Sequence, residues 1–140
     1  QKPDQDGTKD SVANIRETGV FVVNIVEYAM RDAMNVSSAT FDKTDDEFTK
    51  AGIDAIACET IEGFRVHGAP ASLECKLTQI LKLPGETNFA VFGEVTGVHL
   101  RDDCMVDGLF DVRKFQPLSR LGYRDYSVVD NIFSLDRPND

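Results

Sequence analysis

The residues SLECKLTQILKLPGETNFAVFGEVTGVHL, numbered 72–100, decide what kind of fold this chain can adopt. Apolar and polar side chains alternate over 72–81, which predicts a β-strand with leucine and cysteine on one face. The pair Pro84-Gly85 is typical of a turn. A second long strand is predicted over 88–100, and the two glycines inside it favour a bend or a bulge. The stretch therefore predicts a long antiparallel hairpin.

Shorter elements are predicted on both sides of this hairpin. Residues 20–26 (VFVVNIV) are almost continuously apolar and β-branched, which predicts a strand buried on both faces. The other predicted elements are helices over 8–18, 27–34 and 45–52, a mostly irregular segment over 53–70, and a short strand with its own turn over 105–111. Long strands with short helices between them predict an α+β, mostly β fold, built on a barrel or a strongly bent sheet.

The composition limits the chain to one domain and excludes several functions. With 140 residues, the chain is long enough for one core and hardly for two, so residues 1–140 are treated as a single domain. Fifteen Lys and Arg against 24 Asp and Glu leave a net charge of −9, and no basic block offsets it. We therefore expect no nucleic acid partner. No apolar run approaches the length of a membrane span, and no signal segment opens the chain.

Cysteine and histidine are sparse in this sequence. The three cysteines are 17 and 29 residues apart and form no C-x-x-C motif, which predicts free thiols in a reducing, cytoplasmic setting. His67 and His99 are too few and too far apart to frame a metal site or a hydrolase triad. Because His99 is followed by two aspartates at a predicted turn, it is predicted to be a surface residue.

Seven short sequence words follow one another along residues 9–126. They are KDS…NIRETG…FVVN from Lys9, AMNVSS from Ala33, DEF…AG from Asp46, AP…LEC from Ala69, FGEV…VH from Phe92, DG from Asp107, and PL…RLG…Y from Pro117. Each word is weak alone. Together and in this order, they resemble the flavin reductase-like family, a group of FMN-binding split-barrel proteins.

The resemblance implies a cofactor, a reaction and an oligomeric state. It implies FMN as cofactor, NAD(P)H as co-substrate, and a homodimer with the flavin near the subunit interface. The expected reaction is an oxidoreductase step in which hydride passes from the nicotinamide to flavin N5. The family's domain usually opens with strands ahead of the first word, so the chain is expected to be N-terminally incomplete. The alternative is an FMN-binding or storage protein of the same fold without turnover.

Candidate ligands for the flavin phosphate lie at the start of the first predicted helix. A helix N-terminus offers unpaired N–H groups and a partial positive charge, which suits a phosphate. The pattern alone favours a capped surface helix, because caps are common, whereas the resemblance assigns Lys9 and Ser11 to the phosphate. Asn14 lies on the same helix face as Ser11. It reaches either the ribityl chain of the flavin or a neighbouring strand.

Further candidates for cofactor contact lie at two later positions. Asn35 and Ser37 follow an apolar helix and either line the cofactor cleft or begin a loop. The guanidinium of Arg120 suits paired phosphate oxygens, or else a salt bridge to one of the many carboxylates. Tyr126 packs either against the flavin or in the core.

The chain departs from the family pattern at two positions. Many flavin reductases of two-component monooxygenases carry Gly-Asp-His shortly before the Gly-Glu-Val strand. Counting back from Gly93, the place of that histidine is Asn88, which puts efficient NAD(P)H use in question. The second glycine that often follows Arg-Leu-Gly is Tyr123 here. Its ring either narrows the substrate side of the cleft or points into solvent.

Overall fold

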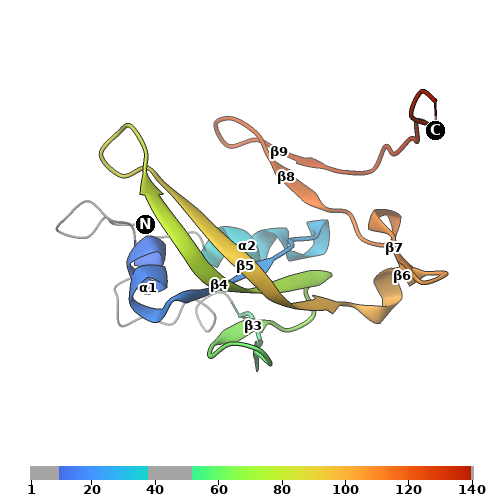
Figure 1. Cartoon of the computed structure of the whole chain (residues 1–140). Coiled ribbons are helices and arrows are strands. Elements are labelled where there is room, and N and C mark those ends of the chain that lie inside the picture. Colours follow the sequence, from blue (N-terminus) through green and yellow to red (C-terminus); the bar gives the residue numbers. More distant parts are fainter. Residues whose placement is uncertain (1–9, 38–51, 140) are drawn as a thin grey trace.

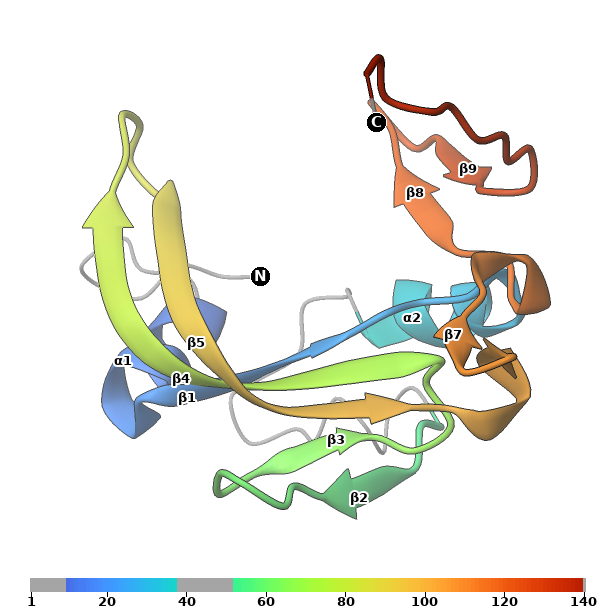
Figure 2. The same ribbon diagram turned by 45° about the vertical axis from the view of Figure 1, so that its right-hand side comes forward.

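The long hairpin predicted from the sequence is the main element of the structure. The computed structural model describes residues 10–37 and 52–139. Strands β4 (Ala71–Lys82) and β5 (Phe89–Leu100) pair antiparallel, and β1 (Val20–Asn24) pairs antiparallel with the other edge of β4, so the strand order is β1-β4-β5. The hairpin bends strongly along its length, as Figure 2 shows.

Two irregularities in the β4–β5 pairing accompany this bend. The register shifts between Glu74 and Cys75, and again between Leu77 and Gln79. The shifts lie beside Gly97 and Gly93 on the partner strand, which confirms the prediction that these glycines mark a bend or bulge. A Cβ at Gly93 would lie 2.5 Å from the Phe21 ring, so only glycine lets the Phe21 side chain of β1 lie this close to the backbone of β5.

Strand β1 differs from its prediction. It was expected to be buried on both faces, yet it is an edge of the described sheet, and Val23 is 39% exposed. The polar residue in its apolar run has a defined role. Asn24 Oδ1 accepts hydrogen bonds from the Val66 N–H at 3.1 Å and from the Ser72 hydroxyl at 2.8 Å. Asn24 thereby joins β1 to β4 and to the short strand β3 (Phe64–Val66), which contains Val66.

The described helices largely follow the sequence signals. Helix α1 (Asp10–Thr18) ends at Gly19, which has φ +73° and donates its N–H to the Ile15 carbonyl at 2.7 Å, as expected of a C-terminal glycine. The helical segment predicted over 27–34 is a 3-10 turn η1 (Tyr28–Met30) followed by α2 (Arg31–Ser37), so it runs three residues further. The helix predicted over 45–52 lies outside the described residues, apart from Gly52.

Short strands and turns make up the remainder. These elements are β2 (Ala55–Ala57), β3 (Phe64–Val66), η2 (Asp102–Cys104), β6 (Met105–Val106), β7 (Leu109–Phe110), η3 (Val112–Lys114), β8 (Leu118–Arg120) and β9 (Tyr126–Val128). The β2–β3 hairpin lies in the segment predicted to be mostly irregular. The predicted strand with its own turn is the β6–β7 hairpin, whose turn residues Asp107 and Gly108 have φ of 51° and 80°.

The buried core follows β4 and the turn after β5. Cys75 and Cys104 are 3% and 0% exposed, and the Phe110 and Phe115 rings lie 5.1 Å apart between centroids. Figure 2 shows the end of the β4–β5 hairpin rising at the left of the view and the β8–β9 hairpin rising at the right. No residue of β4 beyond Cys75 is buried, which marks where the hairpin leaves this core.

Gly93→Ala tests the close approach of the Phe21 ring to β5. The added methyl group would meet the Phe21 ring and the Lys76 carbonyl, so we expect the free energy of unfolding to fall by about 2 kcal/mol. Gly122→Ala is the matched control, because a Cβ there meets nothing within 4 Å. Urea denaturation of both variants measures the difference; equal midpoints would show that the Phe21 ring moves away at no cost.

Candidate functional site

A pocket rich in arginine and tyrosine lies between α2 and the β8–β9 hairpin. It has a volume of about 570 Å³. In Figure 1 the β8–β9 hairpin lies above α2. We call it the Arg–Tyr pocket. Its principal lining residues are Tyr28, Arg31, Asp32 and Asn35 on one side, and Arg120, Tyr123, Arg124 and Tyr126 on the other.

Two arginine–tyrosine stacks form opposite walls of the Arg–Tyr pocket. The Arg31 guanidinium lies 3.9 Å from the centroid of the Tyr28 ring and donates to the Tyr28 carbonyl at 3.0 Å. The Arg120 guanidinium lies 4.8 Å from the centroid of the Tyr126 ring. Such stacking holds a planar cation against an aromatic face while its edge still donates hydrogen bonds.

Arg120 also holds the turn between β8 and β9. Its Nη1 donates to the carbonyls of Leu121 at 2.8 Å and Asp125 at 3.0 Å, and its Nη2 donates to the Tyr123 carbonyl. Within the described part of the chain it makes no salt bridge to a carboxylate. The guanidinium therefore fixes the shape of the turn that carries Tyr123 and Arg124.

The described lining of the Arg–Tyr pocket carries a positive balance of charge. Among these residues, Arg31, Arg120 and Arg124 face one acid, Asp32, in a chain whose net charge is −9. Arg124 forms no ion pair within the described residues. Cationic edges next to aromatic faces are suited to a flat ligand that carries phosphate, because the ring can stack while the arginines meet the oxygens.

A second polar cluster is buried beneath the β2–β3 hairpin and centres on Glu74. This side chain is 0% exposed. Its carboxylate accepts from the backbone N–H of Glu59 at 3.0 Å, from the N–H of Thr60 at 2.7 Å and from the Thr60 hydroxyl at 2.7 Å. His99 Nε2 contacts the same carboxylate oxygen, Oε2, as the Glu59 N–H, and the Thr60 hydroxyl also bonds that of Thr96 at 2.7 Å.

These donors decide the charge of the buried carboxyl group. Burial by itself raises the pKa of Glu74. The N–H groups of Thr60 and Glu59, the Thr60 hydroxyl and His99 donate to the ionised form and outweigh burial, so that the pKa is lowered to about 2. Glu74 is thus a buried carboxylate at neutral pH, and it ties the loop after β2 to strand β4.

Comparison with known proteins places the chain in a family. A family model described as flavin reductase like domain matches residues 6–119. The chain belongs to this family. The sequence resemblance and the predicted mostly β split barrel are thereby confirmed.

The relatives and solved structures extend this match to most of the chain. A protein of Halalkalibacterium halodurans is 33% identical, and the match covers 99% of this chain and 68% of that protein. The 2-nitrobenzoate 2-nitroreductase NbaA of Pseudomonas fluorescens is 30% identical, with a TM-score of 0.82 over 93% of this chain and 65% of that one. Nitrilotriacetate monooxygenase component B of Bacillus cereus is 25% identical, with a TM-score of 0.87 over 96% and 68%.

The chain spans 60 to 68% of the length of the bacterial relatives. Within residues 10–37 and 52–139, no three His, Cys, Asp or Glu side chains are grouped so as to hold a metal ion. No helix in the same residues is long and apolar enough to cross a membrane.

The predicted site residues of this flavin reductase-like chain fall into two groups. Asn35, Arg120 and Tyr126 line the Arg–Tyr pocket together. Ser11 and Asn14 are exposed on α1, which packs on β1 and β4 and contributes nothing to that pocket. Ser37 is the last residue of α2, and Lys9 lies outside the described residues.

The two departures from the family pattern have local explanations. Asn88 lies at the tip of the β4–β5 hairpin, where its Nδ2 donates to the Pro84 carbonyl at 2.9 Å. The amide therefore closes the turn. Tyr123 has φ +58°, a conformation that favours glycine, and the residue is 95% exposed at the mouth of the Arg–Tyr pocket. Of the two alternatives, the structure shows the ring in solvent.

Sequence reasoning missed several of the residues described above. Arg31 and Arg124 belong to no motif, and only the tertiary fold brings them together. The prediction that His99 is a surface residue was wrong. Its side chain is 17% exposed and contacts Glu74, because both project from the same face of the paired strands. The alternation over 72–81 did place Glu74 opposite the leucines, but did not show that a hairpin covers that face.

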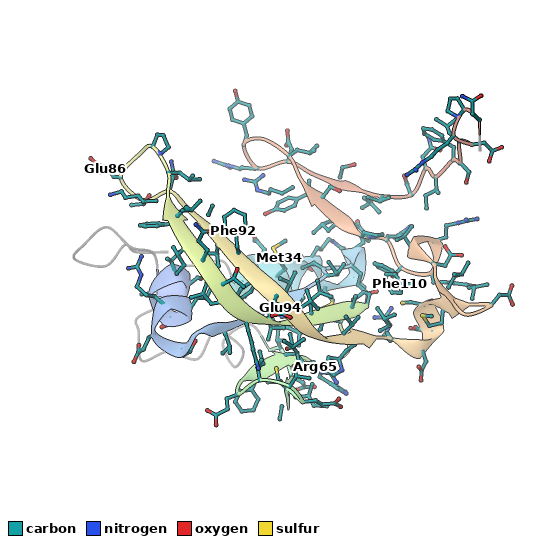
Figure 3. All side chains as sticks on the ribbon, in the orientation of Figure 1. Met34, Arg65, Glu86, Phe92, Glu94 and Phe110 are labelled. Carbon is teal, nitrogen blue, oxygen red and sulfur yellow. The ribbon has the colours of Figure 1, made fainter. Side chains whose placement is uncertain are left out.

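Glu74→Gln tests the buried carboxylate. A pKa lowered from 4.5 to about 2 means that the carboxylate stabilises the folded state above pH 4.5, and that this contribution is lost as the pH falls towards 2. We expect the variant to be less stable at pH 7 by about 2 kcal/mol and to lack this part of the acid-induced loss. Glu94→Gln, an exposed position on β5 that Figure 3 labels, is the control. Denaturant titrations between pH 2 and 7 measure both; parallel curves would contradict the assignment.

Proposed function

We propose that this chain forms the nucleotide-binding part of an NAD(P)H-dependent flavin reductase that uses FMN. The observation that carries the proposal is the Arg–Tyr pocket within a flavin reductase-like fold. Three arginines and three tyrosines line it, and Asp32 is the one acid among its described lining residues. Phosphate-bearing planar rings are the ligands that this combination of charge and aromatic surface suits.

The two groups of predicted residues would bind two different ligands. Lys9, Ser11 and Asn14, at and near the start of α1, would hold the phosphate and ribityl chain of FMN. The Arg–Tyr pocket would hold the nicotinamide nucleotide, with Arg124 and Arg120 towards its pyrophosphate and Tyr126 offering a ring face. Asn35 and Ser37 would add hydrogen bonds from the end of α2. Bound FMN would supply the hydride-accepting chemistry.

The residues of the chain need only bind and orient these two groups. Hydride transfer requires the two rings to be held close together, and needs no acid–base triad. Positive charge along the Arg–Tyr pocket would attract a phosphate-bearing nucleotide to an otherwise acidic protein. The exposed ring of Tyr123 stands at the mouth, where a ligand would enter.

A homodimer and a cytoplasmic location complete the proposal. Leu81, Leu83 and Phe92 are 41%, 42% and 48% exposed on the β4–β5 hairpin, and Figure 3 labels Phe92. Apolar side chains exposed in a group are typical of surfaces that another subunit covers. Sedimentation equilibrium of the protein would give the mass of this assembly.

The free thiols of Cys58, Cys75 and Cys104 fit a reducing, cytoplasmic compartment.

One observation favours a second function, FMN binding or storage without turnover. Asn88 takes the place of a histidine that many reductases of the family carry, and its amide is engaged in the hairpin turn. A turn amide offers no proton or charge to a nicotinamide. The same fold would then keep its flavin without efficient use of NAD(P)H.

Turnover separates these two functions. We expect the purified protein with FMN to oxidise NADH or NADPH well above the protein-free rate, followed at the nicotinamide absorbance band. Bound flavin in the visible spectrum without such turnover would support storage instead. A protein that is colourless and takes up no FMN at high micromolar concentration would contradict both.

Arg124→Gln tests the role of the Arg–Tyr pocket. Losing one charge-assisted contact to the pyrophosphate should raise the KM for the nicotinamide nucleotide about tenfold and leave the Kd for FMN unchanged. Arg113→Gln is the control, because Arg113 is exposed, pairs with Asp111 and lies outside the pocket. Steady-state kinetics and FMN titration give the two quantities. A change in the FMN Kd alone would reverse the assignment of the two ligands.

A further inference from the structure

A second pocket, formed by different residues, lies beside the β2–β3 hairpin. It has a volume of about 480 Å³, and none of its lining residues belongs to the Arg–Tyr pocket. We call it the Arg65 pocket; Figure 3 labels Arg65 beside β3. The lining residues used below are Arg65, His67, Val98, His99, Leu100 and Arg101.

Most of the polar groups around the Arg65 pocket already have partners. Arg101 donates to both carboxylate oxygens of Glu27, at 3.0 and 2.8 Å, and to Asp103 at 2.6 Å. His99 contacts the buried carboxylate of Glu74. These charges are balanced inside the protein and leave little attraction for a ligand.

Arg65 is the exception. Its Nε is buried and has no hydrogen-bond partner, and among the described residues it is the single buried side-chain nitrogen or oxygen atom in this condition. Arg65 forms no ion pair within the described part of the chain. A buried donor without an acceptor is unfavourable, and native proteins rarely retain one without a reason. Because that atom has no accessible surface, an anion in the Arg65 pocket would remove the cost by drawing the guanidinium towards the pocket, where Arg65 is a lining residue.

The remaining surface defines the chemistry of the missing acceptor. His67 is exposed beside Arg65, and Asp102 is the one acid among the lining residues. Val98 and Leu100 on β5 are 55% and 40% exposed, so an apolar wall stands next to the cation. A planar guanidinium edge binds carboxylate or phosphate through two oxygens, and an apolar wall binds a hydrocarbon body.

We propose that the Arg65 pocket binds a small organic anion, with its carboxylate or phosphate on Arg65 and its apolar body on Val98 and Leu100. The pocket is separate from the proposed nucleotide site. Binding there is therefore independent of flavin and of nicotinamide nucleotide, and the inference does not rest on the proposed function.

Benzoate is the first probe, because it combines a carboxylate with an apolar ring. Phenyl phosphate tests the phosphate version of the same chemistry, and benzamide is the neutral control. We expect benzoate or phenyl phosphate to shift the side-chain Nε–H resonance of Arg65 and the backbone resonances of Val98 and Leu100 in NMR titrations. Benzamide should shift them at least tenfold more weakly. Added FMN should leave the affinity unchanged.

Two variants make the test independent of folding. Arg65→Gln should weaken benzoate binding about tenfold by removing the cation. Val98→Glu adds a carboxylate to an exposed position of the wall and should abolish binding while Arg65 remains. Arg113→Gln is the control and should bind as the unchanged protein does. Equal binding by Arg65→Gln in a folded protein, equal binding of benzamide, or shifts confined to the Arg–Tyr pocket would each overturn the proposal.

Discussion

The buried carboxylate of Glu74 is the constraint on which much of the structure depends. An ionised group with no solvent exposure is tolerated only when donors surround it, and here the donors come from two separate stretches of chain: the loop at Glu59 and Thr60, and His99 on β5. Satisfying one side chain thus requires the β2–β3 loop, β4 and β5 to come together. Few apolar side chains are buried in the described residues, so packing alone would specify the arrangement of these three segments less strictly.

The bend of the β4–β5 hairpin has a related origin. Glycines at 93 and 97 stand beside the register shifts, and each is where another chain segment comes close: the Phe21 ring at the first and the Thr60 side chain at the second. The register of the hairpin therefore shifts where the Phe21 and Thr60 side chains lie against it. The Arg–Tyr pocket at the β8–β9 hairpin and the Arg65 pocket at the β2–β3 hairpin share no lining residue.

Asn35, Arg120 and Tyr126 were reached from the sequence because they belong to the words shared with the family. Arg31 and Arg124 were not, since no spacing relates α2 to a turn almost ninety positions later. The role of Arg120 in shaping that turn was equally out of reach, because its acceptors are backbone carbonyls, which carry no residue-type signal. Neighbouring aspartates made His99 resemble a solvated residue, although its partner lies twenty-five positions earlier.

The sequence by itself determined the hairpin, its turn, the glycines that bend it, the end of α1 and the family. These depend on local patterns: alternation with a period of two, the backbone freedom of glycine, and short words in order. Only the tertiary structure decided that Glu74 is buried, that β1 is an edge in the described sheet, and which cations are balanced and which are not. Burial and charge pairing are set by contacts between distant segments, and a single sequence records the residues without recording which of them meet.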